Sequence, residues 1–429
     1  MSPIVISFVI VFVHIKLSSA VDTHLFDAWC EHHGKKYSSV EEKDYRIRVF
    51  EDNLAFITEH NRLKNSTYSL SLNDFADLSH QEFKTSRLGL RVIPLNTSHS
   101  IRKSSLLLIR ESGAAAEIPT SMDWRKKGAV TPVKNQASCR ASWAFSATGA
   151  IEGINKIVTG SLVSLSEQEL LECDKSYNYG CNGGLMDSAF QWVIDSHGIS
   201  TDQNYPYEAK DSTCNEKLKS WPISIDGYAA IPANDEKQLL QTVAFQPVSA
   251  GICASDRAFQ FYSKGIFNGQ CSTTLLDHGV LIVGYDSEKG VDYWIVKNSW
   301  GSKWGMDGYM QILRNSGKVG GVCGINTLAS YPIKRSTPKK PNVFPSSNTA
   351  SCDLLRYCVG GEKCCCSARF IICWDWICCR MADGVCCDGV RKCCPNGFAC
   401  DKHGGCHKVH GNATRLGELG QNSLWKFGA

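Results

Sequence analysis

Cysteine is the residue type that most constrains how this chain can fold. The sequence of 429 residues holds 22 cysteines, and fourteen of these lie between Cys352 and Cys406. Cysteine at this density predicts an oxidising compartment and disulfide bonds. Because this short module has little apolar surface to bury, disulfides have to hold its fold, and its cysteines suffice for seven internal bridges. A metal is not expected, because zinc-binding cysteine pairs are separated by roughly two to four residues, whereas these cysteines recur as doublets and a triplet.

The first 20 residues have the pattern of a secretory signal. A nearly uninterrupted apolar run from Ile4 to Ile15 precedes the small residues 18–20. A membrane anchor is the alternative, but the run is too short to span a bilayer comfortably, and no later stretch is apolar enough. We therefore expect a secretory route to a vacuole or lysosome-like compartment or to the outside, with no membrane association after signal removal. Three glycosylation sequons agree with this route: Asn65, Asn96 and Asn412.

Length and composition predict several domains. Residues 21–117 are charged and helix-rich, and residues 118–333 are rich in Gly, Trp and Tyr, like a folded catalytic body. Residues 334–351 contain three prolines and few apolar side chains, which is typical of an extended linker. The cysteine-rich module 352–406 and a tail over residues 407–429 complete the chain. The small net charge of +4 gives no reason to expect nucleic acid as a partner.

One helical face in residues 21–117 mixes polar and apolar side chains. Its members recur at steps of three and four residues, which places them on one side of a helix. An ordinary amphipathic surface helix is the simplest interpretation, but the mixture favours a face that makes specific contacts. The six members are Glu42, Arg46, Phe50, Asn53, Ile57 and Asn61.

Three further motifs lie in residues 118–333. They are Gly180-Cys181-Asn182-Gly183-Gly184, Asp277-His278-Gly279 and Asn298-Ser299-Trp300-Gly301. Together with the helical face, they resemble the papain-like cysteine proteases, and the whole arrangement is similar to the plant subgroup with a C-terminal granulin domain. The helical face is identical to the family's inhibitory prosegment signature. Asn73, Phe75 and Asp77 match its second prosegment motif, with Ser71 where glycine is usual.

The resemblance implies an α+β, papain-like fold of two lobes. A mainly helical lobe would have a long central helix starting near Ser142, and a β-barrel-like lobe would carry His278 and Asn298. Residues 21–117 would be a helical inhibitory prosegment, and residues 352–406 a disulfide-rich granulin module. The disulfides carried over from the family would be Cys139–Cys181, Cys173–Cys214 and Cys271–Cys323, which leaves Cys30 and Cys253 without partners. We interpret Cys253 as an inert buried thiol.

The resemblance also implies the catalytic roles. The family's nucleophile is a cysteine thiolate whose pKa is lowered by a helix N-terminus and a neighbouring protonated histidine. Here His278 would be that histidine, Asn298 would orient it, and Trp300 would shield their hydrogen bond from water. Gln136 and the backbone N–H of residue 142 would form the oxyanion hole.

Serine occupies the position of the nucleophile. The hydroxyl of Ser142 cannot be ionised in this way, so His278 would have to remove its proton during attack. In a site shaped for sulfur, the shorter side chain is expected to hold Oγ too far from the base, and a displacement of about 1 Å can cost roughly a hundredfold in rate. We therefore expect peptide hydrolysis to be lost or strongly reduced. Neighbouring departures from the family's run Gln-Gly-Ser-Cys-Gly-Ser-Cys-Trp are Ala137, Arg140 and Ala141.

Arg140 replaces a glycine that lines the S1 side of the cleft in the family. We expect its guanidinium to fill part of the cleft and to disfavour protonation of His278; a side chain turned to solvent is the alternative. Peptide binding is expected to be less damaged, although tight turns explain the two glycines of the cleft equally well if the cleft is blocked. The implied substrate-binding residues are Gly183, Gly184, Asp277 and Trp300, with Met186, Ala250 and Gly251 around an apolar S2 subsite.

Three functions stay open. The first is an inactive or weak peptidase homologue, without a cofactor, that binds its own prosegment and peptides or proteins in its cleft, as a decoy or storage protein. The second is an active endopeptidase that uses Ser142 with His278. The third is an interaction protein whose granulin module binds a partner while the peptidase body is a carrier.

Overall fold

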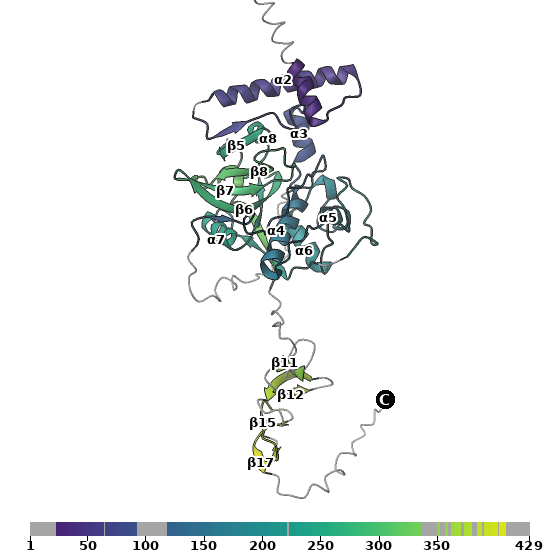
Figure 1. The fold of residues 1–429 in the computed structure, drawn as a ribbon, viewed down its shortest axis with the longest axis vertical. Coiled ribbons are helices and arrows are strands. Elements are labelled where there is room, and N and C mark those ends of the chain that lie inside the picture. The colour runs from purple at the N-terminus through teal and green to yellow at the C-terminus, as the bar shows by residue number, and fades with distance from the viewer. Residues whose placement is uncertain are drawn as a thin grey trace, which may run out of the picture. The chain divides into compact units, whose positions relative to one another are not determined.

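The structure, a computed structural model, describes most of the chain. The described residues are 23–63, 65–91, 118–220, 223–335, 350–351, 357–358, 362–369, 373–379, 384–387, 390–401 and 403–408. The expected signal, most of the expected linker and nearly all of the tail lie outside them. The chain divides into two compact units, residues 1–336 and 337–429 (Figure 1). Of the helices in the described ranges, none combines the length and the apolar character needed to cross a bilayer.

The first unit begins with helices, as predicted for the prosegment. A helix over residues 23–33 precedes α2 (Val40–Arg62), β1 (Tyr68–Leu70) and α3 (His80–Arg87). Figure 1 shows α2 as a long helix at one end of the unit, with α3 between it and the body. Both labelled helices begin at a serine whose hydroxyl accepts a backbone N–H of the first turn. Such caps satisfy N–H groups that have no partner within the helix, so these two helices begin where the sequence provides a cap.

The six-residue face of α2 makes specific contacts. Phe50, Asn53 and Ile57 are buried, and three of the polar members bond to the stretch from Leu70 to Glu82. This stretch holds the second prosegment motif, so the two motifs of the prosegment bind each other. The bonds are Arg46 Nη1 to Glu82 Oε1 (2.9 Å), Asn53 Nδ2 to the Ala76 carbonyl (2.9 Å) and Asn61 Nδ2 to the Leu70 carbonyl (2.8 Å).

A helical lobe follows. It contains α4 (Ser142–Thr159), α5 (Glu167–Cys173), α6 (Met186–Asp195) and a short 3₁₀ helix, Gly180–Asn182. Most residues of α4 are buried, which fits the expected central helix. It ends where Gly160 takes a left-handed backbone conformation with φ of 81°, the usual device for terminating a helix. At its other end, the N-terminus of α4 lies beside the second lobe, where the Gly279 N–H donates to Ser142 Oγ.

The second lobe is built around a nine-stranded sheet. The strand order is β1-β5-β8-β7-β6-β4-β9-β3, and β2 pairs with β6 off this path. All pairs are antiparallel except β5 with β8. The prosegment therefore adds its own strand, β1, to one end of the sheet. The remaining strands and helices of this lobe are β2 (Met122–Asp123), β3 (Gly227–Ile231), β4 (Val248–Ile252), β5 (Tyr262–Phe267), β6 (His278–Glu288), β7 (Val291–Lys297), β8 (Tyr309–Leu313), β9 (Leu328–Ile333), α7 (Glu236–Phe245) and α8 (Arg257–Gln260).

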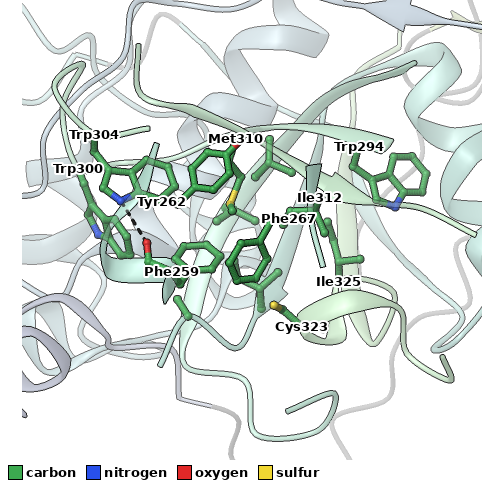
Figure 2. Packing of buried hydrophobic residues seen from close by; sticks show 14 of the residues in the cluster. Phe259, Tyr262, Phe267, Trp294, Trp300, Trp304, Met310, Ile312, Cys323 and Ile325 are labelled. Carbon is green, nitrogen blue, oxygen red and sulfur yellow. Dashed lines mark hydrogen bonds between the residues drawn. The ribbon is translucent and has the colours of Figure 1, made fainter. Parts of the chain in front are cut away.

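An aromatic cluster fixes the end of this lobe that faces the prosegment. Figure 2 shows Trp300, Trp304, Phe259, Tyr262 and Phe267 packed together. The indole N–H of Trp304 donates to the Phe259 carbonyl at 3.3 Å, which pairs a polar atom that burial would otherwise leave unsatisfied. The cluster thus holds Trp300, the residue after the Asn298-Ser299 pair, in one place.

The second unit consists of short paired strands joined by disulfides. Its strands are β10 (Ala350–Ser351), β11 (Tyr357–Cys358), β12 (Lys363–Arg369), β13 (Cys373–Cys379), β14 (Val385–Cys386), β15 (Cys393–Cys394), β16 (Phe398–Cys400) and β17 (Cys406–Lys408). Four bridges join described cysteines: Cys358–Cys378, Cys365–Cys386, Cys387–Cys400 and Cys394–Cys406.

The expectation of seven bridges in this module is wrong. Cys379 and Cys393 are free thiols. They end β13 and begin β15, and their sulfur atoms lie within 4.8 Å of each other. A disulfide bond is about 2 Å long, and no such bond joins these two neighbouring sulfur atoms.

Candidate active site

Ser142 begins the central helix. It is the first residue of α4, and Ala141 before it provides no side-chain cap. The positive end of the helix dipole therefore lies at this residue. Ser142 is fully buried, and its Oγ accepts a hydrogen bond from the Gly279 N–H at 3.0 Å. The hydroxyl is thus bonded to the backbone next to His278 and not to the imidazole.

His278 and Asn298 form a hydrogen-bonded pair. His278 begins β6, Asn298 directly follows β7, and His278 Nε2 lies 2.8 Å from Asn298 Oδ1. Because Oδ1 also accepts the Ser299 N–H at 2.8 Å, Nε2 is the donor of the pair. The lone pair of the neutral ring is then on Nδ1, which has no hydrogen-bond partner among the described residues. Burial lowers the pKa of His278 to about 4, opposed by the bond to Asn298, so the ring is neutral near pH 7.

Trp300 covers this pair. Its ring centroid lies 4.6 Å from that of His278, and the residue is 1% exposed. From the prosegment, Phe75 and Phe83 meet the indole edge-on at centroid distances of 5.7 and 5.2 Å. Such aromatic pairs contribute roughly 0.5–1.5 kcal/mol each beyond their burial. Docking of the prosegment therefore helps to keep water away from His278.

Gln136 bonds to the prosegment. Its Nε2 donates to the Arg87 carbonyl at 2.9 Å and to the Cys139 carbonyl at 2.9 Å, and its Oε1 accepts the Ser299 hydroxyl at 2.7 Å. An amide N–H held in this way can stabilise a developing oxyanion. In the proform, a carbonyl oxygen of the prosegment takes that donor.

Residues 87–91 of the prosegment, here called the cleft segment, run through the cleft. The Gly184 N–H donates to the Gly89 carbonyl at 3.2 Å, and the Arg91 N–H donates to the Gly184 carbonyl at 3.2 Å. The Leu90 N–H donates to the Asp277 carbonyl at 2.9 Å. The Asp277 carboxylate faces away from this contact and accepts the Ala254 N–H at 2.7 Å, and burial raises its pKa. Gly184 and Asp277 therefore bind peptide backbone, here that of the prosegment.

The side chain of Leu90 fills an apolar pocket. Leu90 packs in one cluster with Met186, Leu276 and Leu328, and a Cβ placed on Gly251 would lie 2.8 Å from Leu90 Cδ2. Gly251 is thus part of the pocket, and Met186 belongs to the same buried cluster. Sequence reasoning missed Leu90, Leu276 and Leu328; the apolar residues on both sides of Gly89 were the available signal for the cleft segment.

Ala250 corrects the predicted S2 set. It is fully buried and belongs to the cluster at the other face of the sheet, which also contains Ile252 and Val280. Successive residues of a strand point to opposite faces. Since Gly251 faces Leu90, its neighbour Ala250 in β4 faces away from the pocket.

Arg140 lies along the rim of the cleft. Its Nε donates to the Cys181 carbonyl at 3.2 Å and its Nη2 to Asn182 Oδ1 at 3.0 Å. The guanidinium is therefore neither free in solvent nor directed at the imidazole. Burial lowers the pKa of His278, and the bond to Asn298 opposes this effect. The expected electrostatic contribution of Arg140 to this pKa is not found.

Three disulfides brace the body. They are Cys139–Cys181, Cys173–Cys214 and Cys271–Cys323, the same pairs that the resemblance implies. Cys253, directly after β4, is a free thiol that is 3% exposed and lies 3.2 Å from Ser255 Oγ. Cys30 in the prosegment is also free, and burial raises its pKa.

Candidate metal ligands cluster only in the second unit, as far as the described residues show. Each of the three groups includes at least one cysteine that is bound in a disulfide, and such a sulfur is not a thiolate ligand. The groups are Cys365, Cys379 and Cys393; Cys387, Cys394 and Cys400; and Cys358, Glu362 and Cys378.

Comparison with known proteins agrees with this arrangement. The papain family cysteine protease model matches residues 118–333, the cathepsin propeptide inhibitor domain (I29) matches residues 26–83, and the granulin model matches residues 363–407. The chain is 46% identical over 392 residues to "Probable cysteine protease RD21B" of Arabidopsis thaliana, covering 89% of this chain and 83% of that relative.

Solved proforms are similar as well. The digestive procathepsin L 3 of Tenebrio molitor larval midgut is 41% identical with a TM-score of 0.63, over 73% of this chain and 99% of that one. The proform of the ragweed pollen allergen Amb a 11, a cysteine protease, is 39% identical with a TM-score of 0.64, over 73% and 95%. The chain therefore belongs to the papain family of cysteine proteases, with the I29 prosegment and a granulin domain in the same polypeptide.

Proposed function

We propose that this chain is a papain-family proenzyme homologue that binds peptides in its cleft and hydrolyses them slowly or not at all. The observation that carries the proposal is the bond from the Gly279 N–H to Ser142 Oγ beside an unpaired His278 Nδ1. A serine nucleophile needs a short hydrogen bond from its own hydroxyl to the base. Here the imidazole of His278 is hydrogen-bonded to Asn298, but it has no hydrogen bond to Ser142.

Binding is supported by the cleft segment. Its backbone bonds go to Gly184 and Asp277, and the side chain of Leu90 enters the apolar pocket. None of these contacts uses Ser142. The cleft can therefore hold a peptide whether or not the chemistry follows, which favours a decoy or storage role.

An active endopeptidase with a Ser142 nucleophile is the alternative. It would require the hydroxyl to leave Gly279 and to approach Nδ1 once the prosegment is gone. In the proform, burial lowers the pKa of His278, so the ring is neutral, which is the form a general base needs. The alternative depends on the distance between Ser142 Oγ and His278 Nδ1 after the prosegment has left, and activity measurements decide between the two.

We also propose that the protein follows the secretory route to a vacuole or to the cell exterior as a glycoprotein. The disulfides of both units support an oxidising compartment.

The purified proform is expected to remain uncut when it is held alone near pH 5. Removal of the prosegment by the molecule itself would need the same nucleophile, and Ser142 lacks its bond to His278. Gel electrophoresis over several protein concentrations, with Ser142→Cys as the positive control, measures this. Shortening of the wild type to a product that begins near Ile118, and its loss in Ser142→Ala, would contradict the proposal.

Thiolate-directed epoxide or vinyl-sulfone probes are expected to leave the matured protein unlabelled, after an added protease has removed the prosegment with its free Cys30. Cys253 is buried, and burial, followed by the bond from Cys379, raises the pKa of Cys393 to about 11, so its thiol stays protonated near pH 7. Intact-mass spectrometry after probe treatment provides the readout. Labelling that persists in Cys253→Ala and disappears in Ser142→Ala would show a reactive serine instead.

A further inference from the structure

Gly89 of the cleft segment passes through a narrow slot. A Cβ on Gly89 would lie 2.4 Å from Arg140 Cβ and 2.5 Å from the Arg140 carbonyl oxygen. On the other side, a Cβ on Gly183 would lie 2.1 Å from the Gly89 carbonyl oxygen. Carbon contacts this short do not occur in packed proteins. In this position, the chain that occupies the cleft has room for glycine only.

Arg140 keeps the slot narrow. Its side chain contributes the nearest atom, Cβ, and its guanidinium is bonded to the Cys181 carbonyl and to Asn182 Oδ1. The adjacent disulfide Cys139–Cys181 joins the same two loops. Because both walls are tied together, the Arg140 backbone cannot retreat from a larger side chain without breaking these bonds.

The next two residues of the cleft segment have binding positions of their own. Leu90 fills the apolar pocket. The guanidinium of Arg91 lies over the ring of Tyr179, 5.1 Å from its centroid, within the range of a cation–π contact. Three consecutive positions therefore take a glycine, an apolar side chain and a cation.

We propose that Arg140 makes the cleft selective for glycine, and that the peptide ligands of this protein contain a Gly-Leu-Arg-like sequence bound as residues 89–91 are. The part of this inference that concerns the binding of separate peptides rests on the proposed function. The part that concerns the contact between Arg140 and Gly89 applies to the proform and does not depend on that function. Glycine in place of Arg140 removes the Cβ contact and both guanidinium bonds, whereas the carbonyl contact at 2.5 Å and the Cys139–Cys181 disulfide remain, so the backbone at residue 140 becomes free to shift and admit a Cβ.

The first test uses amide hydrogen exchange of the full-length chain. Gly89→Ala is expected to reduce protection of the Leu90 amide about tenfold or more, as overpacking does, while amides of the β4–β6 pair stay protected and report that the body is folded. Arg140→Gly alone is expected to keep the Leu90 amide protected. The double variant is expected to regain most of the protection. Unchanged protection in Gly89→Ala, or a double variant no better than Gly89→Ala, overturns the role of Arg140.

The second test uses full-length Gly89→Ala, in which the cleft segment is displaced. Fluorescently labelled Leu-Gly-Leu-Arg and Leu-Ala-Leu-Arg peptides, blocked at both ends, are titrated in a polarisation assay. Binding of the glycine peptide at least about tenfold tighter is expected, and this preference should disappear when Arg140→Gly is added. Equal binding of both peptides overturns the glycine selectivity alone. Failure of both peptides to bind overturns the peptide-binding function. The hydrogen-exchange test still decides separately whether Arg140 restricts the position of Gly89 in the proform.

Discussion

Ser142→Cys is expected to raise the rate of peptide hydrolysis at least about a hundredfold over the wild type, once an added protease has removed the prosegment. The thiol at this position would be at the N-terminus of α4 and next to an imidazole that already bonds to Asn298, two features that favour a thiolate. A fluorogenic peptide with leucine at the S2 position measures the rate.

Two further variants serve as controls for that result. Ser142→Ala sets the background, and His278→Ala in the Ser142→Cys chain should abolish the gain. A wild type that is as fast as Ser142→Cys, with activity lost in Ser142→Ala, would establish the serine peptidase instead. If Ser142→Cys stays inactive, the slot at Arg140 is the next cause to test, by adding Arg140→Gly.

The granulin module is expected to survive proteolysis in the linker as a compact fragment from near Cys352 to Cys406, and to be digested once a reductant is added. Its described bridges, for example Cys387–Cys400 and Cys394–Cys406, join cysteines within the module. Each native disulfide in a small domain contributes about 2–5 kcal/mol, and such a domain has little core without them.

Mass spectrometry of the fragment, before and after reduction, measures this. The unit from residue 118 to 333 serves as a comparison, because it has a large apolar core and should lose less resistance on reduction. A bridge between the module and any cysteine from Cys139 to Cys323 would contradict the view of two independent units.

Much of the fold could be predicted because its signals are local or repeated. The spacing of residues on the face of α2 predicted one side of a helix, and Phe50, Asn53 and Ile57 are buried on that side. The motifs around His278 and Asn298 carry the family resemblance, which implied a pair, and His278 Nε2 lies 2.8 Å from Asn298 Oδ1. Short sequence patterns suffice when a geometry depends on a few residues.

Other features depend on contacts between distant segments, and the sequence did not reveal them. The direction of the Ser142 hydroxyl depends on the Gly279 N–H, and Gly279 belongs to β6, far from Ser142 in the sequence. The slot around Gly89 depends on Arg140 and Gly183 meeting across the cleft. Ala250 is different, because alternation along β4 would have distinguished it from Gly251 without any structure.

The strand that the prosegment adds to the sheet has a consequence for how the processed molecule behaves towards its own copies. β1 pairs with one side of β5, with Tyr68 opposite Gly265, while β8 pairs with the other side. Loss of the prosegment turns β5 into an edge strand whose N–H and C=O groups can template association with another chain. The exposed Lys264 in the middle of β5 is a charge of the kind that discourages such pairing. Removal of the prosegment would therefore change how the molecule associates with its own copies as well as access to its cleft, and Lys264 would oppose pairing at the new edge.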